Sequence, residues 1–197
     1  MKLASLALAP ALALGLAVPA MAEKIPLNEI SRYLNSIRTA QSAFTQVNGD
    51  GTISTGTVFI QRPGRVRFEY NNEPTVVMAS GGTVAVFDMK SNGAEQQYPL
   101  NTTPLSIILA ENVNLGQARM VTNHTESENA TVVTAQDPAH PEYGNIQMRF
   151  TSNPTQLRQW VVTDNAGMKT TVVLGEMATG VSIPSSKFDI SREQRRR

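Results

Sequence analysis

The polar part of the chain opens with one amphipathic helix. Apolar side chains recur at Leu27, Ile30, Leu34 and Ile37, which is the spacing of one face of an α-helix. Polar residues occupy most of the positions between them. The spacing therefore predicts a helix between Leu27 and Ala40 whose apolar face lies on other structure.

After this helix the hydrophobic period changes to two. In residues 65–70 three apolar or aromatic residues alternate with three charged ones, as in a strand with one dry face. Turn signals such as Pro63-Gly64 and Asn153-Pro154 separate the runs, and no helix lies between consecutive strands. The pattern predicts a large antiparallel sheet, closed or half-closed. The further expected strands are 57–61, 75–79, 84–87, 131–135, 146–151, 156–163 and 169–174.

One segment interrupts the strands. Residues 103–110 predict a short helix with Thr103 as N-cap and Pro104 at the first position. Apolar side chains cover most of its circumference. A single helix inserted into a sheet is often a lid or a plug, so we expect this helix to cover the sheet.

The first 22 residues predict a cleaved secretory signal peptide. Lys2 precedes an apolar stretch, and the segment ends in the small residues Ala20 and Ala22. The stretch is short and rich in alanine for a membrane span, although an uncleaved anchor is the alternative. Cleavage leaves residues 23–197, and we expect these 175 residues to form a single domain. The chain has no cysteine, which excludes both an acylated N-terminal cysteine and a disulfide framework.

Charge and motifs exclude several classes of function. Loss of Lys2 reduces 17 basic residues to 16, which balance 16 acidic ones, and no basic stripe suggests nucleic-acid binding. The arginines at 195–197 are interpreted as a solvated tail, or as a weak attraction to anionic lipid. His124 and His140 are expected in exposed loops, and their spacing fits no zinc site. No nucleophile elbow or phosphate-binding loop occurs, so we expect no enzyme, no cofactor and no metal.

The segment 59–70 resembles the strand-turn-strand signature of the periplasmic outer-membrane lipoprotein carrier family, LolA. The strand in this signature is more basic than usual at Arg65 and Arg67, which we interpret as tuning the docking of a partner. Phe68 stands where some family members carry tryptophan. Further matches follow in order at Phe44-Thr45-Gln46, Gly56, Arg62-Pro63-Gly64, 80–83, Val86-Phe87-Asp88, 101–104, 164–167 and Phe188-Asp189-Ile190.

This resemblance implies a mainly β fold with some α: an incomplete, unclosed antiparallel β-barrel of about eleven strands covered by lid helices. It implies a periplasmic chaperone that binds the acyl chains of lipoproteins, takes them from an inner-membrane lipoprotein-releasing ABC transporter and passes them to an outer-membrane acceptor. In the family, the arginine of the R-P-[GN] turn bonds to lid backbone and holds the empty carrier shut. The matching residue is Arg62, and we expect the protein to be a monomer.

Candidate cavity and lid residues lie on the dry faces of the strands and on the apolar faces of the two helices. Sequence does not separate them from ordinary packed core. The open alternatives are a periplasmic lipoprotein-sensing regulatory protein of the same fold, an envelope enzyme acting on lipid, and a structural envelope protein. The candidate residues are Ile30, Leu34, Ile37, Val66, Phe68, Tyr70, Val84, Val86, Leu105, Ile108, Leu109, Ile146, Met148 and Phe150.

Overall fold

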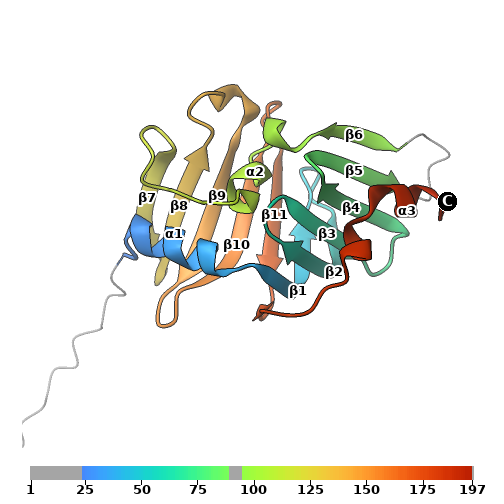
Figure 1. Ribbon diagram of the computed structural model, residues 1–197. Coiled ribbons are helices and arrows are strands. Elements are labelled where there is room, and N and C mark those ends of the chain that lie inside the picture. Colours follow the sequence, from blue (N-terminus) through green and yellow to red (C-terminus); the bar gives the residue numbers. More distant parts are fainter. Residues whose placement is uncertain (1–23, 89–94, 197) are drawn as a thin grey trace, which may run out of the picture.

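The computed structural model describes residues 24–88 and 95–196. The predicted signal peptide, residues 1–22, lies outside the described residues. Within the described ranges the strands form one antiparallel sheet that curves around the helices α1 and α2 (Figure 1). No helix in these two ranges is both long enough and apolar enough to cross a membrane.

The sheet is open. Its strands follow the order β6-β5-β4-β3-β2-β1-β11-β10-β9-β8-β7, and β12 pairs with one end of β1. The outermost strands, β6 and β7, pair only with β5 and β8 within the described sheet, which confirms the predicted unclosed antiparallel fold. The strands are β1 (Thr39–Val47), β2 (Ile53–Gln61), β3 (Arg65–Tyr70), β4 (Thr75–Ser80), β5 (Thr83–Asp88), β6 (Gln96–Pro99), β7 (Val121–Ser127), β8 (Ala130–Gln136), β9 (Asn145–Thr151), β10 (Gln156–Thr163), β11 (Lys169–Leu174) and β12 (Ala178–Thr179).

The first helix is shorter than the periodicity predicts. The helix α1 spans Leu27–Ser36, Ile37 already has extended backbone, and β1 starts at Thr39. β1 is central, because it pairs along its whole length with β2 and also with β11. These pairings outweigh the local helical pattern. The remaining helices are η1 (Leu100–Thr102), α2 (Leu105–Leu109), η2 (Pro141–Tyr143), η3 (Ser185–Phe188) and α3 (Ile190–Gln194).

Two local predictions are wrong. Thr103 does not cap α2, because its hydroxyl donates to the Leu100 carbonyl at 2.8 Å and so closes the preceding turn, which leaves Pro104 at the N-cap position. His124 lies within β7 rather than in a loop, and its Nε2 atom is 2.9 Å from the Ile25 carbonyl oxygen. Most residues of β7 are exposed, so the strand has no apolar alternation by which the sequence would reveal it.

α1 fills one half of the concave side of the sheet. Ile30 and Leu34 are buried in the same core as the inward-facing residues of β9. The ring of Tyr33 meets Phe150 edge to face at 6.1 Å. Figure 1 shows α1 lying across β8, β9 and β10. The concave space that is left lies beyond the end of α1, towards β3–β5.

The C-terminal segment, which contains η3 and α3, covers the outer face of the other half of the sheet. Ile183 and Phe188 pack on Phe59, which points away from the concave side. α3 follows and begins at Asp189, whose side chain accepts a hydrogen bond from the Arg192 backbone N–H at 2.9 Å. A second outer cluster contains Met78, Ala85 and Phe87, with Val76 and Ile190 packed against it.

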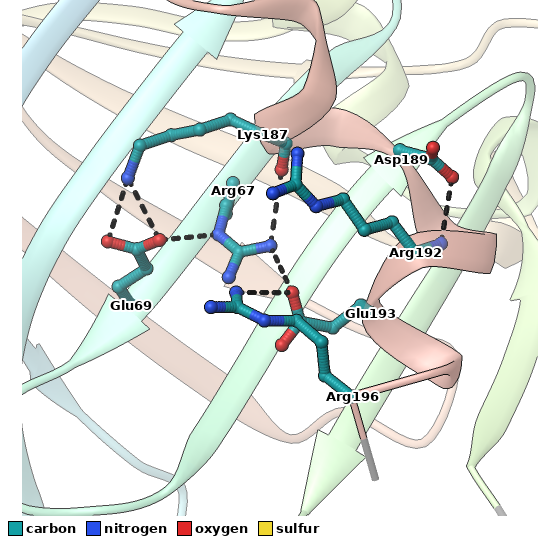
Figure 2. Close-up of polar contacts among 7 residues, drawn as sticks. All are labelled: Arg67, Glu69, Lys187, Asp189, Arg192, Glu193 and Arg196. Atoms are coloured by element: carbon teal, nitrogen blue, oxygen red, sulfur yellow. Dashed lines mark hydrogen bonds and ion pairs between the residues drawn. The ribbon is translucent and has the colours of Figure 1, made fainter.

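A chain of ion pairs joins this segment to β3 (Figure 2). Arg67 contacts Glu69 at 2.6 Å and Glu193 at 2.9 Å, and Lys187 also contacts Glu69, at 3.0 Å. Arg67 is only 5% exposed, beneath the C-terminal segment. The interpretation that Arg67 tunes the docking of a partner is therefore wrong, because its guanidinium is already paired within the chain. Arg65 is exposed and donates to Gln61.

The Glu69 carboxylate makes the outer ion pairs sensitive to acid. Burial alone would raise the pKa of Glu69, but hydrogen bonds from Lys187 and Arg67 outweigh burial, so this pKa lies below its ordinary value. In the unfolded chain the pKa of a glutamate is about 4.3, and above that pH the ionised Glu69 stabilises the fold. This stabilisation is lost as the pH falls through the lower pKa that Glu69 has in the folded chain. We expect the stability advantage over Glu69→Gln, measured by urea unfolding, to be constant above about pH 5.5 and to shrink at lower pH. An advantage that did not change down to pH 3 would contradict this assignment.

Candidate functional site

A cavity of about 610 Å³ lies between the inner face of the sheet and the segment before and at the start of α2. We call residues 100–115, which contain η1 and α2, the lid segment. Strands β3, β4, β5, β10 and β11 supply most of the wall, and the lid segment covers it. The lining residues are Gln46, Phe68, Tyr70, Val77, Val84, Val86, Tyr98, Thr102, Thr103, Pro104, Leu105, Tyr143, Trp160, Val162, Asp164, Asn165, Thr170 and Val172.

Aromatic rings form the deep wall of the cavity. Phe68 meets Phe44 edge to face at 5.4 Å and Trp160 at 6.4 Å, and Phe44 meets Tyr70 at 5.3 Å. Trp160 is 2% exposed and is the only tryptophan in the chain. Together with the valines of β4, β5, β10 and β11, these rings make an apolar surface that suits a hydrocarbon ligand.

The rim of the cavity is polar and includes one charged residue, Asp164. The Tyr70 hydroxyl donates to Gln46 Oε1 at 2.9 Å. Asp164 Oδ1 accepts the backbone N–H groups of Ala166 and Met168, each at 2.9 Å, and so closes the β10–β11 turn. Burial raises the pKa of Tyr70, although its hydrogen bond with Gln46 opposes this. Burial also raises the pKa of Tyr98, so both phenols stay protonated at neutral pH.

The structure divides the predicted cavity residues into two groups. Five of them line the cavity: Phe68, Tyr70, Val84, Val86 and Leu105. The other nine belong to the packed core and are not among the lining residues: Ile30, Leu34, Ile37, Val66, Ile108, Leu109, Ile146, Met148 and Phe150. α1 and Ile37 after it, α2 and β9 pack together in this core, and Val66 of β3 is buried in it as well. Sequence reasoning missed Val77, Tyr98, Trp160, Val162 and Val172 as lining residues.

Arg62 ties the lid segment and α1 to the end of β2. The side chain is 7% exposed, and its guanidinium donates to the carbonyls of Leu34 and Ala110 and to Asn35 Oδ1. The Arg62 backbone N–H also donates to Arg38 at 2.8 Å. Burial and the charge of Arg38 lower the pKa of Arg62. The guanidinium also reaches the Glu111 carbonyl at 3.5 Å, so three carbonyls and one amide, from α1 and from the lid segment, hold the positive charge.

Asn35 and Ser31 form a second set of polar contacts between α1 and the lid segment. The Asn35 amide pairs with both backbone groups of Val113, donating at 2.9 Å and accepting at 2.8 Å. Ser31 Oγ, one turn earlier, accepts the Leu115 N–H at 3.1 Å. The sequence places both residues off the apolar stripe of the helix, which reveals their polarity but not this pairing. The lid segment is therefore joined to α1 by polar contacts besides those of Arg62.

The described residues 24–88 and 95–196 contain no cluster of three or more His, Asp or Glu side chains arranged to hold a metal ion. His140 is exposed, pairs with Glu142 at 3.0 Å and stacks on Tyr143 at 4.7 Å. Tyr143 in turn lines the rim of the cavity. The site therefore offers apolar enclosure, hydrogen bonds at its rim and a cover held by polar contacts.

The sequence model of the family described as outer membrane lipoprotein carrier protein LolA matches residues 35–191. An outer-membrane lipoprotein carrier protein of Coxiella burnetii is 28% identical over 178 residues, covering 82% of this chain and 80% of that protein. One from Methylococcus capsulatus is 25% identical over 179 residues, covering 86% and 85%. Among solved structures, a LolA superfamily protein from Nitrosomonas europaea aligns with 85% of this chain and 99% of its own, at 10% identity and a TM-score of 0.43. The family match spans well over half of the sequence and confirms the resemblance, so the chain belongs to the LolA family of outer membrane lipoprotein carrier proteins.

Proposed function

We propose that this protein is a periplasmic carrier that binds the acyl chains of lipoproteins and moves them from the inner to the outer membrane without catalysing a reaction. It receives its cargo from a lipoprotein-releasing ABC transporter and passes it to an outer-membrane acceptor, and it acts as a monomer. The observation that carries this proposal is an apolar cavity beneath a lid segment that is held by polar contacts.

The energetics of acyl chains explain why such a cavity is needed. Burying a chain contributes about 0.8 kcal/mol for each methylene group, so a chain of about 15 methylenes contributes roughly 12 kcal/mol. A lipoprotein cannot cross an aqueous compartment unless this surface is covered. A carrier that covered the acyl chains without any opposing free-energy cost would not release them to a membrane. The polar contacts of the lid supply that opposing cost, because they are complete only when the lid is shut.

Arg62 is the proposed latch. Its guanidinium bonds to α1 and to the lid segment at once, so displacement of either element breaks charge-assisted hydrogen bonds. In this proposal cargo with more than one acyl chain enters when the lid segment moves away, and closure of the latch favours its departure. Leu105 lines the cavity, whereas Leu109 is buried next to the latch, so movement of α2 changes both places.

Trp160 provides a direct test of occupancy. We expect a lipopeptide with a bromine atom on its acyl chain to quench the fluorescence of Trp160 by at least about half at saturation, because the indole lies in the cavity wall. The unbrominated lipopeptide is the control. Since the chain has one tryptophan, the signal comes from this site alone. Quenching no greater than that of free indole in the same solution would contradict the proposed site.

Transfer between membranes tests the carrier function itself. Donor vesicles with an acylated fluorescent peptide and lipid-only acceptor vesicles are separated by a dialysis membrane that passes the protein and retains vesicles. We expect the labelled peptide to reach the acceptor vesicles only when the protein is added. Binding without transfer would support a sensing protein of the same fold rather than a carrier.

A further inference from the structure

The volume of the cavity limits how much hydrocarbon the latched protein holds. A methylene group is close in size to a water molecule, which occupies about 30 Å³ in the liquid. A cavity of about 610 Å³ therefore has room for roughly 20 methylene groups. This is enough for one acyl chain and too little for two. Further chains need the lid segment to be displaced.

One part of the polar lining gathers where strands end. Gln46 lies near the end of β1, Tyr70 ends β3, and Asp164 and Asn165 follow β10. These positions meet at one rim, while the wall of Phe68, Trp160 and the valines lies deeper in the sheet. A bound chain accordingly lies with its methylenes on the apolar wall and its polar end at this rim.

The charge at the rim is negative. Asp164 is the one ionised side chain among the lining residues in the described ranges, and no lysine or arginine is among them. Lys169 precedes the lining residue Thr170 in β11, so strand alternation directs it to the opposite face. Glu73 adds to the field, since its charge raises the pKa of Tyr70. A negative head group at this rim is therefore repelled.

We propose that the latched cavity takes a single acyl chain whose polar end is uncharged, as in a glyceryl ester or an acyl amide, and that Asp164 disfavours ionised lipids. The inference rests on the proposed lipid-binding function and adds a ligand class to it. It gives the carrier a means to reject free fatty acids and anionic phospholipids, which have acyl chains of the same kind but carry charge at the polar end.

The test compares two ligands with the same chain, monolauroylglycerol and laurate, at pH 8 and low salt. Each displaces the uncharged probe N-phenyl-1-naphthylamine from the mature protein, and native mass spectrometry counts the bound lipid. We expect one lipid per protein, and a half-displacing concentration roughly fivefold lower for monolauroylglycerol than for laurate. In Asp164→Asn, the half-displacing concentration of laurate is expected to fall to within about twofold of that of monolauroylglycerol, because the repulsion of the carboxylate is removed.

Asp50→Asn is the matched control. Asp50 also closes a hairpin turn, with Oδ1 accepting the Thr52 N–H at 2.9 Å, but it does not line the cavity. Asparagine retains the accepting oxygen in both variants, so both turns are preserved. Equal affinities of the wild type for the two lipids, equal effects of the two variants, or two bound lipids per protein would each overturn the inference and leave the proposed function standing. Failure of the probe and of both lipids to bind would overturn the two together.

Discussion

Replacement of Arg62 by leucine is expected to tighten the binding of a ligand with two acyl chains, which needs the open lid, by roughly 10- to 100-fold and to slow its release by a similar factor. The guanidinium bonds to carbonyls of α1 and of the lid segment, and these bonds exist only while the lid is shut. A hydrogen bond to a charged group contributes about 1.5–3 kcal/mol. Loss of even one such hydrogen bond raises the population of the open form. The apparent affinity for the ligand then rises, because a larger fraction of the protein molecules is open and able to bind.

The measurement is the rate at which a fluorescent ligand with two acyl chains leaves the preloaded protein for excess lipid vesicles, followed by stopped-flow. Arg38→Leu is the control, because Arg38 is exposed and accepts its hydrogen bond from Arg62 through its backbone carbonyl, which leucine keeps. Arg62→Lys is expected to behave like Arg62→Leu, since a lysine cannot present the planar fork that reaches two elements. Unchanged release from Arg62→Leu, with normal unfolding in urea, would show that Arg62 is not the latch.

Asn35→Ala is expected to act in the same direction with a smaller effect, about three- to tenfold on release. Its amide makes neutral hydrogen bonds to Val113, which contribute less than those of a guanidinium, and its loss removes only one of the acceptors of Arg62. Asn35→Asp removes the donor to the Val113 carbonyl but places a carboxylate against the Arg62 guanidinium, so its release rate is expected to lie closer to the wild type than that of Asn35→Ala. The same release assay checks the order. A release rate for Asn35→Ala equal to that of the wild type would restrict the latch to Arg62.

The strands that show clean alternation were predictable from the sequence. β3, β5 and β9 follow the expected spacing, and Phe68, Val84 and Val86 do line the cavity. The resemblance to the LolA family supplied what alternation does not, namely the open sheet, the lid and the significance of Arg62.

The position of the cavity was not predictable, because it depends on how α1 lies on the sheet. Inward-facing residues of β3 and of β9 look alike in the sequence, yet Phe68 and Tyr70 of β3 line the cavity and no residue of β9 does. β10 adds a second difficulty. Its pairing with β9 shifts between Leu157 and Gln159, so Leu157 and Trp160 are both buried although they are three residues apart. Simple alternation from Leu157 would direct Trp160 away from the cavity.

Covered outer faces explain the error at Arg67. In a half-buried strand, a charged residue that alternates with apolar ones is expected to face solvent. Here the outer face of β3 is covered by a segment more than 100 residues later in the chain, whose Glu193 and Lys187 complete the ion pairs. Neither the spacing within β3 nor the composition of the C-terminus reveals that these charges meet.

Alanine in place of Gly56 is expected to destabilise the fold by about 3 kcal/mol, which shifts the urea midpoint by more than 1 M. Gly56 lies in the middle of β2, opposite Phe44 in β1 and Tyr70 in β3. A Cβ atom at this position would lie 2.8 Å from the Phe44 ring and would overlap the Glu69 carbonyl oxygen. The backbone of β3 cannot move away without breaking its pairing with β2, so the strain remains in the folded state.

Gly175→Ala is the matched control for this substitution. A Cβ atom at Gly175 meets its nearest neighbour, the Ala43 carbonyl oxygen, at 3.4 Å, which is ordinary contact. Its effect is expected to lie within about 1 kcal/mol of zero, and to be stabilising if the loss of freedom in the unfolded chain dominates.

Phe44 contacts the rings of both Phe68 and Tyr70, so the strain at Gly56 also reaches the cavity wall. We therefore expect the Gly56→Ala protein to bind the brominated lipopeptide more weakly under conditions where it remains folded. Equal urea midpoints for the two variants would show that the close approach of β1, β2 and β3 at Gly56 is not what holds the aromatic wall in place.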